Sequence, residues 1–401
     1  MSDTKTIYLD NAATTATYNE VIDAMIPYFR ENYGNPSSIY HLGAKTKEAI
    51  TNARRTIAGT LNALPEEIYF TAGGSEGDNW AIFASADFYK NKGKHIITSS
   101  IEHHGVLHVC EYLRKTHGYE ITYLPVDELG QINANDLKEA LRDDTILVSI
   151  MFANNEIGTI QNIKELAKIT HDNGTLFHTD AVQAYGHIEI DIKDLEVDIF
   201  SASGHKFHGP KGVGFTYIKK GVKIGSFVHG GAQERKRRAG TENVPGIVGM
   251  AKAADIMHTN LTKNISYETN LRDYMIYRIY NEIPYCRLNG PTTNRLPNNI
   301  NFSFQFIEGE SLLIMLDMKG ICASSGSACT SGSLDPSHVL LAIGLPHEIA
   351  HGSLRLSISE ETTKEEIDFT VDVLKSIIEN LRAMSPLYED FIKKEKAKES
   401  K

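Results

Sequence analysis

The sequence predicts an α/β fold with a large, mostly parallel sheet covered on both faces, followed by a smaller α+β unit. Between about residues 65 and 220, short β-rich apolar runs alternate with helical segments, which is the order typical of parallel sheets. The run Thr145–Met151 is apolar at both odd and even positions, as expected for a strand buried on both faces. After about residue 260 the alternation stops, which indicates a second structural unit.

Six runs are predicted as strands of the large sheet: Glu67–Thr71, His95–Thr98, Glu120–Leu124, Thr145–Met151, Thr175–His178 and Asp198–Ser201. Beyond them, we expect a helix over Asn264–Asn281 and an alternating, half-buried strand over Asn298–Phe304. The last well-defined helix spans Thr362–Leu381, where Thr363 and Glu366 fit a capping box.

A chain of 401 residues suggests two domains. We expect a large domain over residues 15–260 and a small domain formed by 1–14 and 261–385, which carries a loop at about 321–335. The charged tail, residues 386–401, is expected to be disordered from Ile392 onward.

Composition excludes several classes of protein. The formal net charge of −10 argues against a general nucleic-acid binder, although Glu234–Arg238 is a basic run that can be either a solvated loop or a functional segment. No window reaches the roughly 18 apolar residues of a membrane span. The N-terminus has neither an apolar signal core nor a transit-peptide composition. Four cysteines without a signal peptide indicate free thiols in a cytoplasmic protein, and their spacing predicts no metal site.

The segment FTAGGSEGDNW, residues 70–80, places Gly73-Gly74 between a strand and a helix that begins near Ser75. The N-H groups at a helix N-terminus favour an anion, so Gly74 and Ser75 could bind a phosphate. A turn without a ligand is the alternative.

Two further strand ends carry polar groups. Asp180 stands where a buried strand ends, an edge where α/β proteins bind ligands; an N-cap for a following helix is the alternative. Lys206 lies in a Gly-rich loop beside Ser203 and His205. It could form a Schiff base with a carbonyl cofactor, or it could be a surface lysine.

Two more strand ends add imidazoles, in Ser100–Gly105 (SIEHHG), and amides, in Asn154–Gly158 (NNEIG). Satisfied loop histidines are the simpler interpretation of the first. Together, however, these strand ends bring an anion site, an acid, a lysine, imidazoles and amides to one rim. Pyridoxal 5′-phosphate (PLP) requires donors for its phosphate, a carboxylate for its ring nitrogen and a lysine for its aldehyde.

At this point the sequence resembles a fold-type-I PLP enzyme, and within that group a cysteine desulfurase of the NifS/IscS type in the class-V aminotransferase family. The resemblance runs from Tyr8 to about residue 385 and rests on these motifs: YLDNAATT (8–15), GNPSS (34–38), EH (102–103), NNEIG (154–158), DAVQ (180–183), SGHK (203–206), GTEN (240–243), SSGSACTSGS (324–333) and SLRLS (353–357). One departure is Ser359-Glu360, where relatives often carry Gly-Arg.

The resemblance implies a role for each matching residue. Lys206 would be the Schiff-base lysine, Asp180 would pair with the ring nitrogen, and Gln183 would bind the phenolic oxygen. His103 would stack on the ring and transfer protons. The phosphate would be held by Gly74, Ser75, Ser203 and His205, with Thr241 reaching in from the second subunit of a homodimer. Asn155 and Arg355 would hold the carboxylate of the substrate, which Arg can grip with two parallel hydrogen bonds.

Cys329 matches the nucleophile of the family and would accept sulfur from L-cysteine as a persulfide, leaving L-alanine. Its small-residue loop is of the longer type, which implies sulfur transfer to an iron–sulfur scaffold protein of the IscU/NifU kind or another acceptor, with no membrane or direct nucleic-acid contact. We expect Cys322, Cys110 and Cys286 to be buried packing residues. The alternatives are another PLP lyase or aminotransferase, such as a selenocysteine lyase, or a non-catalytic scaffold.

Overall fold

The computed structural model describes residues 6–325 and 336–399. Its larger sheet has seven strands in the order β2-β8-β7-β6-β5-β3-β4. Strands β4, β3, β5, β6 and β7 run parallel to one another, whereas β8 is antiparallel to both β2 and β7. The predicted mostly parallel α/β sheet is therefore confirmed. The strand bounds are Ile68–Thr71 (β2), His95–Ser99 (β3), Glu120–Leu124 (β4), Thr145–Ser149 (β5), Leu176–Asp180 (β6), Ile199–Ser203 (β7) and Gly214–Ile218 (β8).

Helices cover both faces of this sheet. Buried side chains of α4 and α5 pack on one face, and those of α3, α7, α8 and the first half of α10 pack on the other. The helix bounds are His41–Thr60 (α3), Gly74–Tyr89 (α4), His104–His117 (α5), Ala134–Ala140 (α6), Ile163–Asp172 (α7), Ile192–Leu195 (α8) and Val244–Glu282 (α10).

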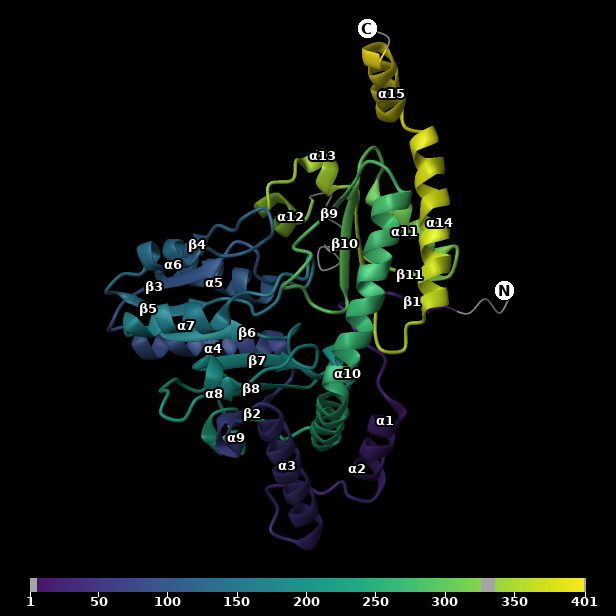
Figure 1. Cartoon of the computed structure of the whole chain (residues 1–401). Coiled ribbons are helices and arrows are strands. Elements are labelled where there is room, and N and C mark those ends of the chain that lie inside the picture. Colours follow the sequence, from purple (N-terminus) through teal and green to yellow (C-terminus); the bar gives the residue numbers. More distant parts are fainter. Residues whose placement is uncertain (1–5, 326–335, 400–401) are drawn as a thin grey trace.

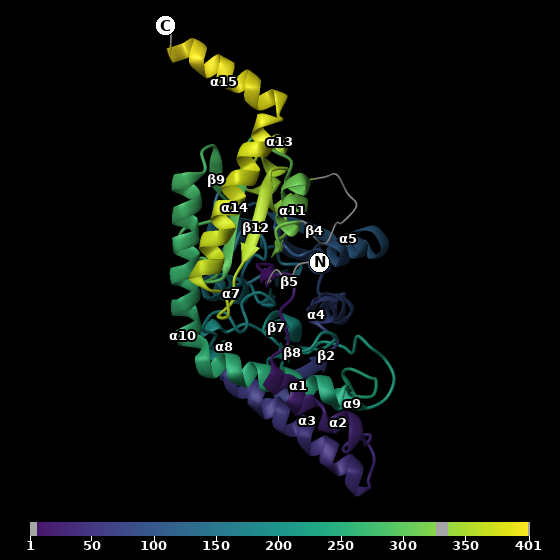
Figure 2. The same ribbon diagram turned by 90° about the vertical axis from the view of Figure 1, so that its right-hand side faces the viewer.

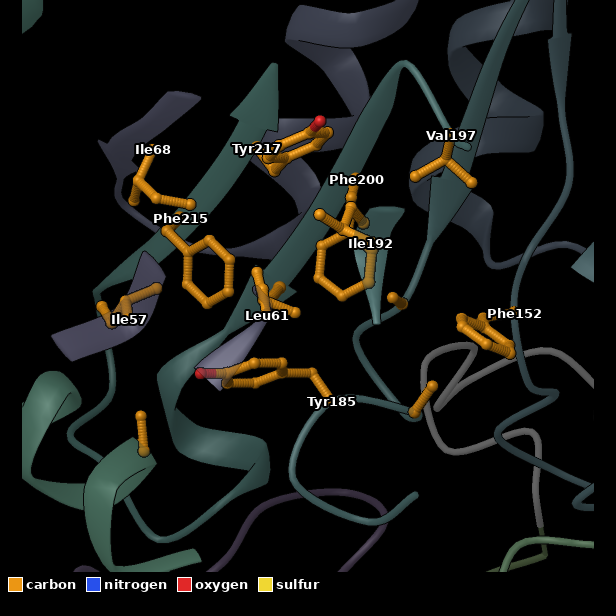
Figure 3. Close-up of a cluster of buried hydrophobic side chains, with 14 of the residues drawn as sticks. Ile57, Leu61, Ile68, Phe152, Tyr185, Ile192, Val197, Phe200, Phe215 and Tyr217 are labelled. Carbon is orange, nitrogen blue, oxygen red and sulfur yellow. The ribbon is translucent and has the colours of Figure 1, made fainter. Parts of the chain in front are cut away.

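The core beneath the second face is rich in aromatic rings (Figure 3). The ring of Tyr185 meets those of Phe207, Phe215 and Phe200 edge to face, with centroids 4.9, 5.0 and 6.2 Å apart. Such edge-to-face pairs stabilise a core beyond the area that they bury. They fix the turn after β6 against β7 and β8, and this fixes the sheet edge on which the candidate site lies.

The smaller unit is built on a three-stranded antiparallel sheet in the order β12-β10-β9. Its core is completed by α11 and by the buried apolar side chains of α14, and the predicted capping box is present at Thr363 and Glu366. A short parallel pair, β1 with β11, lies beside it. The bounds are Ile7–Tyr8 (β1), Cys286–Leu288 (β9), Asn299–Phe304 (β10), Gly309–Asp317 (α11), Ile321–Cys322 (β11), Ser353–Ser357 (β12) and Lys364–Ala383 (α14).

The 39-residue helix α10 joins the two units. Its first half packs against α3 and α1, its second half packs against α14, and the helix changes direction between them (Figure 2). The expected boundary near residue 260 falls inside this helix. The division into residues 15–260 and residues 1–14 with 261–385 remains a prediction. The remaining helices are α1 (Asn19–Met25), α2 (Pro27–Arg30), α9 (Gln233–Lys236), α12 (His338–Ala342), α13 (His347–Ala350) and α15 (Pro386–Glu399), with short 3-10 turns at η1 (Pro65–Glu67) and η2 (Gly204–Lys206).

The expectation of a disordered tail is wrong for the described residues, because Pro386–Glu399 forms helix α15, which projects away from the body (Figure 1). The ring of Phe391 packs on those of Tyr285 and Phe306, with centroids 5.1 and 4.9 Å apart. Ion pairs such as Lys393 with Glu389, four residues apart, add support along the helix. The aromatic contacts of Phe391 therefore anchor a segment whose many charged residues suggest that it is wholly polar.

Two other expectations also need correction. Strand β10 exists, but it is buried along its whole length rather than half-buried, because Asn299 and Asn301 donate to the carbonyl oxygen of Glu156. The basic run 234–238 is not a freely solvated loop, since Glu234 is buried against Arg54 and Arg238 pairs with Glu76 at 2.8 Å. Among the described residues, no helix has the length and apolar character needed to cross a membrane.

Candidate active site

A cavity of about 640 Å³ opens at the carboxyl ends of the parallel strands. It lies where β3, β5, β6 and β7 end, and Ala12, Ala13 and Arg355 close it from the side of the smaller unit. Most of the predicted site residues line it: Gly74, Ser75, His103, Asn155, Asp180, Gln183, Ser203, His205, Lys206 and Arg355. Residues far apart in sequence are thus brought together as the strand-end argument predicts.

Lys206 follows β7 in the η2 turn and is held by the N-terminal motif. Its Nζ donates to the carbonyl oxygens of Ala12 at 2.6 Å and Ala13 at 2.9 Å. Gln183 donates from Nε2 to the same Ala12 carbonyl at 2.9 Å. The segment around Ala12 therefore positions two of the predicted cofactor-binding side chains from one backbone position.

Asp180 is the last residue of β6 and is 5% exposed. Its Oδ1 accepts a hydrogen bond from the Val182 N-H at 2.9 Å. No helix follows it directly, so the interpretation as an N-cap is wrong. Burial raises the pKa of its carboxyl, and the nearby His103 and Lys206 oppose that rise. A buried acid in this place favours a cationic or protonated ligand group.

His103 is the N-cap of α5. Its Nδ1 accepts a hydrogen bond from the Gly105 N-H at 3.0 Å. Because an accepting Nδ1 carries no proton, a neutral His103 ring carries its proton on Nε2. The side chain lines the cavity, so Nε2 is the ring position suited to proton exchange with a ligand.

The start of α4 has the features of an anion site. The N-cap is Gly73, and no side chain caps the first turn, which lines the cavity. A Cβ at position 74 would lie 2.4 Å from Cγ2 of Val182, so a larger residue there would require Val182 to shift. The Oγ of Ser203 lies close by, 3.6 Å from where a Cβ of Gly73 would be. Uncapped N-H groups and hydroxyls suit a phosphate.

Arg355 lies in β12 and is 2% exposed. Its guanidinium donates from Nη1 to the carbonyl oxygen of Asn155 at 3.0 Å and from Nη2 to Asp10 Oδ1 at 2.9 Å. Within the described part of the chain, its buried Nε-H has no hydrogen-bond partner. A guanidinium that is held in place by two hydrogen bonds and has a third donor left unsatisfied suits the binding of a carboxylate.

Two predicted residues are not placed in the cavity. Thr241 is exposed and is absent from the cavity lining. Cys329 lies outside the described residues. Of the cysteines predicted to be packing residues, Cys110 is buried as expected, whereas Cys286 and Cys322 are only partly buried.

The sequence analysis missed three acids near the cavity: Asp10, Asp78 and Glu102. Asp78 is 1% exposed on the buried face of α4, beside Gly77 and Ala81. An acid on an otherwise apolar helix face is a signal that could have found it. Glu102, which is fully buried, stands in the quoted EH motif but was given no role.

The residues present fit PLP. The uncapped start of α4 suits its phosphate, Asp180 suits its protonated ring nitrogen, and Lys206 suits its aldehyde. A site of this kind at the carboxyl edge of a mostly parallel sheet defines a PLP-dependent enzyme of fold type I.

Comparison with known proteins gives the particular family. The model of the aminotransferase class-V family matches residues 7–369. The cysteine desulfurase IscS of Methanosarcina thermophila is 56% identical over 96% of this chain and 95% of its own. The cysteine desulfurase IscS of Clostridium botulinum is 55% identical over 98% of this chain and 100% of its own.

Among solved structures, a NifS-like protein superposes with a TM-score of 0.89 at 39% identity, covering 94% of this chain and 100% of its own. A structure described as SspA in complex with cysteine superposes with a TM-score of 0.80 at 35% identity, covering 89% of this chain and 100% of its own. The chain belongs to the class-V aminotransferase family, and within it to the PLP-dependent cysteine desulfurases of the NifS/IscS type.

Proposed function

We propose that the chain converts L-cysteine and the thiol of Cys329 into L-alanine and a persulfide on Cys329. One sulfur atom moves from substrate to enzyme, the thiol proton of the enzyme ends on the product or the persulfide, and the reaction needs no external oxidant or reductant. The observation that carries the proposal is the meeting of Lys206, Asp180 and Arg355 in one cavity. The similarity to IscS proteins supports the same substrate.

The cofactor, when bound, supplies an electron-withdrawing ring that stabilises negative charge on the α-carbon of the substrate. Lys206 would hold its aldehyde, Asp180 its ring nitrogen and Gln183 its phenolic oxygen. Its phosphate would be held by Gly74, Ser75, Ser203 and His205.

The side chains of the enzyme then orient the substrate and move its protons. Arg355, fixed by Asp10 and the Asn155 carbonyl, offers its free Nε-H to the substrate carboxylate, with Asn155 beside it. His103 exchanges a proton through Nε2. An ordinary thiol is only a few per cent ionised at neutral pH, so Cys329 needs a base. His103 is the candidate, and to act as one its ring must release the Gly105 N-H from Nδ1 or carry its proton there instead of on Nε2.

Replacing Cys329 with alanine tests the sulfur acceptor. The Cys329→Ala variant should bind PLP as the wild type does and should release no sulfide from cysteine. Cys322→Ala is the matched control, because Cys322 lies only seven positions away and on strand β11; it should retain wild-type release of alanine and sulfide. Undiminished sulfide release by Cys329→Ala would contradict the proposal.

We also propose that the active unit is a homodimer in which Thr241 of one subunit completes the phosphate site of the other. Thr241 is exposed and lies outside the cavity of its own subunit. Large apolar side chains are exposed together around α1, α2 and the start of α3: Ile22, Ile26, Phe29, Tyr33, Ile39 and Tyr40. Several large apolar side chains exposed on segments that follow one another in the chain favour a protein partner.

Mixed dimers test this arrangement. A dimer of one Lys206→Ala subunit and one Thr241→Val subunit retains one cavity with both residues intact only if Thr241 acts across the interface. It should therefore recover activity that neither parent dimer has. Absence of recovery, with mixed dimers verified by mass, would show that Thr241 acts elsewhere.

For the fate of the sulfur, we propose transfer in the cytoplasm to an iron–sulfur scaffold protein. Similarity to proteins named IscS and NifS-like supports this acceptor, and the comparisons favour neither the selenocysteine lyase nor the non-catalytic alternative. The test compares transfer of labelled sulfur from the enzyme to a purified scaffold protein and to a tRNA-thiolation relay protein. Preferential labelling of the relay protein would contradict the scaffold assignment.

A further inference from the structure

Two buried acids lie beside Asp180 and have no role in the mechanism above. Asp78 comes from α4 and Glu102 from the turn before α5, and their exposed fractions are 1% and 0%. Within the described part of the chain, neither forms an ion pair with lysine or arginine. We call Asp78, Glu102 and Asp180 the buried acid cluster.

Asp78 lines the cavity together with Asp180. Its Oδ1 is buried, has no hydrogen-bond partner among residues 6–325 and 336–399, and lies 3.6 Å from Nε2 of His178. Both ring nitrogens of His178 are already bonded, to Ser149 Oγ at 2.8 Å and to Ser201 Oγ at 3.0 Å. Burial lowers the pKa of His178 to about 3, so the ring is neutral and brings no positive charge to Asp78.

Glu102 is tied to the cavity wall. Its Oε1 accepts from Ser99 Oγ at 2.5 Å and from the N-H of Met151, a lining residue, at 2.9 Å. Its Oε2 is buried and has no hydrogen-bond partner among the residues that the structure describes. Glu102 directly precedes His103 in the sequence. Its backbone carbonyl oxygen accepts a hydrogen bond from Nε2 of His338 at 3.0 Å.

Helices α4 and α5 are in contact beside His103, and this contact brings Asp78 and Glu102 to the same region. A Cβ added at Gly105 would lie 3.1 Å from Nδ1 of His103 and 3.5 Å from Oδ2 of Asp78. Asp78 thus lies near His103 on the cavity wall that also holds Asp180, and Glu102 lies behind that wall, bonded to the lining residue Met151.

Such acids are unfavourable when buried without a cationic partner. Burial raises the pKa of Glu102 to about 8 and, with the nearby Asp180, raises that of Asp78 well above its usual range. Each also leaves one oxygen unsatisfied, which costs free energy. A feature that destabilises the protein in or directly behind the wall of a ligand site is typical of functional groups. A cation entering the cavity would favour the ionised acids, and by reciprocity the acids would favour the cation.

We propose that Asp78 and Glu102 act with Asp180 as one buried acid cluster that holds a proton on the ring nitrogen of the bound cofactor. Both are positioning residues for that charge and act through Asp180. The inference rests on the role proposed above for Asp180, but it does not depend on cysteine being the substrate.

The test measures the affinity of the full-length apoprotein for PLP and for 1-deaza-PLP, in which carbon replaces the ring nitrogen. In the wild type, PLP should bind more tightly. Asp78→Asn and Glu102→Gln, which keep the shape of each side chain, should each reduce that preference by about tenfold, the equivalent of one pKa unit of lost stabilisation. Both variants should also raise the Tm of the apoprotein, because each removes a buried acid.

Glu268→Gln is the matched control. Glu268 is equally buried, in α10 outside the cavity, and burial raises its pKa as well. This variant should raise the Tm but leave the preference for PLP unchanged. The Asp180→Asn variant sets the upper limit of the effect, because it should show the largest loss of preference for PLP over 1-deaza-PLP.

The outcomes are distinguishable. A loss of preference in Asp180→Asn, with none in Asp78→Asn or Glu102→Gln, would overturn the cluster and leave the role of Asp180 standing. No loss in Asp180→Asn would contradict that role itself. Equal weakening of PLP and 1-deaza-PLP, with a lowered Tm, would mean that the two acids are structural and would also overturn the proposal.

Discussion

Replacing Arg355 with lysine tests how the cavity binds the substrate carboxylate. The guanidinium donates to two fixed partners, the Asn155 carbonyl at 3.0 Å and Asp10 at 2.9 Å, and its buried Nε-H has no partner among the described residues. Lysine retains the charge but has one nitrogen on a flexible stem. A lysine side chain therefore cannot bond to both the Asn155 carbonyl and Asp10 and also hold another donor in a fixed position for the substrate carboxylate.

The expected size of the effect follows from that lost donor. A hydrogen bond to a charged group contributes about 1.5–3 kcal/mol, and about 1.4 kcal/mol corresponds to a factor of ten in affinity. Arg355→Lys should therefore raise the KM for cysteine roughly 10- to 150-fold. The kcat should change little, because the carboxylate lies away from the bond that breaks.

The assay is steady-state formation of alanine, with Arg295→Lys as the matched control. Arg295 is also buried in the smaller unit, where it bonds to Asn289, Pro291 and Asn299, and it lies outside the cavity. Its variant should lose thermal stability and keep the wild-type KM. An unchanged KM in Arg355→Lys, or an equal rise in both variants, would refute the role of Arg355.

Three further predictions concern stability. Lys236 has a φ of +66°, a left-handed conformation that costs a side chain about 1 kcal/mol, so Lys236→Gly should raise the Tm in a thermal melt; a lowered Tm would contradict the strain. Thr363→Ala removes the capping box of α14 and should cost about 1 kcal/mol in denaturant unfolding, while Thr116→Ala, at an exposed helix position, should cost less. The hydrogen bond from His171 to Asp198 at 2.8 Å raises the pKa of His171. The pair thus stabilises the fold fully below the unfolded-state pKa of about 6.5 and loses that effect as pH rises through the folded pKa. His171→Asn should therefore lower the Tm more at pH 5.5 than at pH 8.5, and an equal loss at both pH values would contradict the pairing.

Local sequence signals predicted the framework well. The capping box of Thr363 and Glu366 forms as expected, because it depends only on residues three positions apart. Asp180 and Lys206 could be placed at one rim because parallel strands end on the same edge, whatever the details of packing. Spacing and topology were sufficient for these residues.

Long-range contacts were beyond local signals. The tail forms a helix because Phe391 finds rings more than 80 residues away in sequence. Glu360, which departs from the Gly-Arg common in relatives, accepts from the Tyr18 hydroxyl and lies 3.5 Å from His208. That contact ties the end of β12 to the segment after Lys206. It could not be inferred, because its three members come from three separate parts of the chain.

The acids near the cavity that were not predicted show the same limit of local sequence signals. Asp78 and Glu102 are buried on elements whose local sequence gives no indication that they converge. Asp10 was part of a quoted motif, but its function as the partner of Arg355 appears only when β12 is placed beside the N-terminal segment. Which side chains support a catalytic group depends on tertiary packing.

The central claim, sulfur transfer from L-cysteine to Cys329, is tested most directly by mass spectrometry of the protein after one turnover. The PLP-loaded enzyme is mixed with an equimolar amount of cysteine labelled with heavy sulfur, quenched, and digested without reductant. The prediction is one labelled sulfur atom added to the peptide that contains Cys329, in amounts equal to the alanine formed, with none on the peptides of Cys322, Cys286 or Cys110. Alanine formed with no label on Cys329, or label carried by another cysteine, would contradict it.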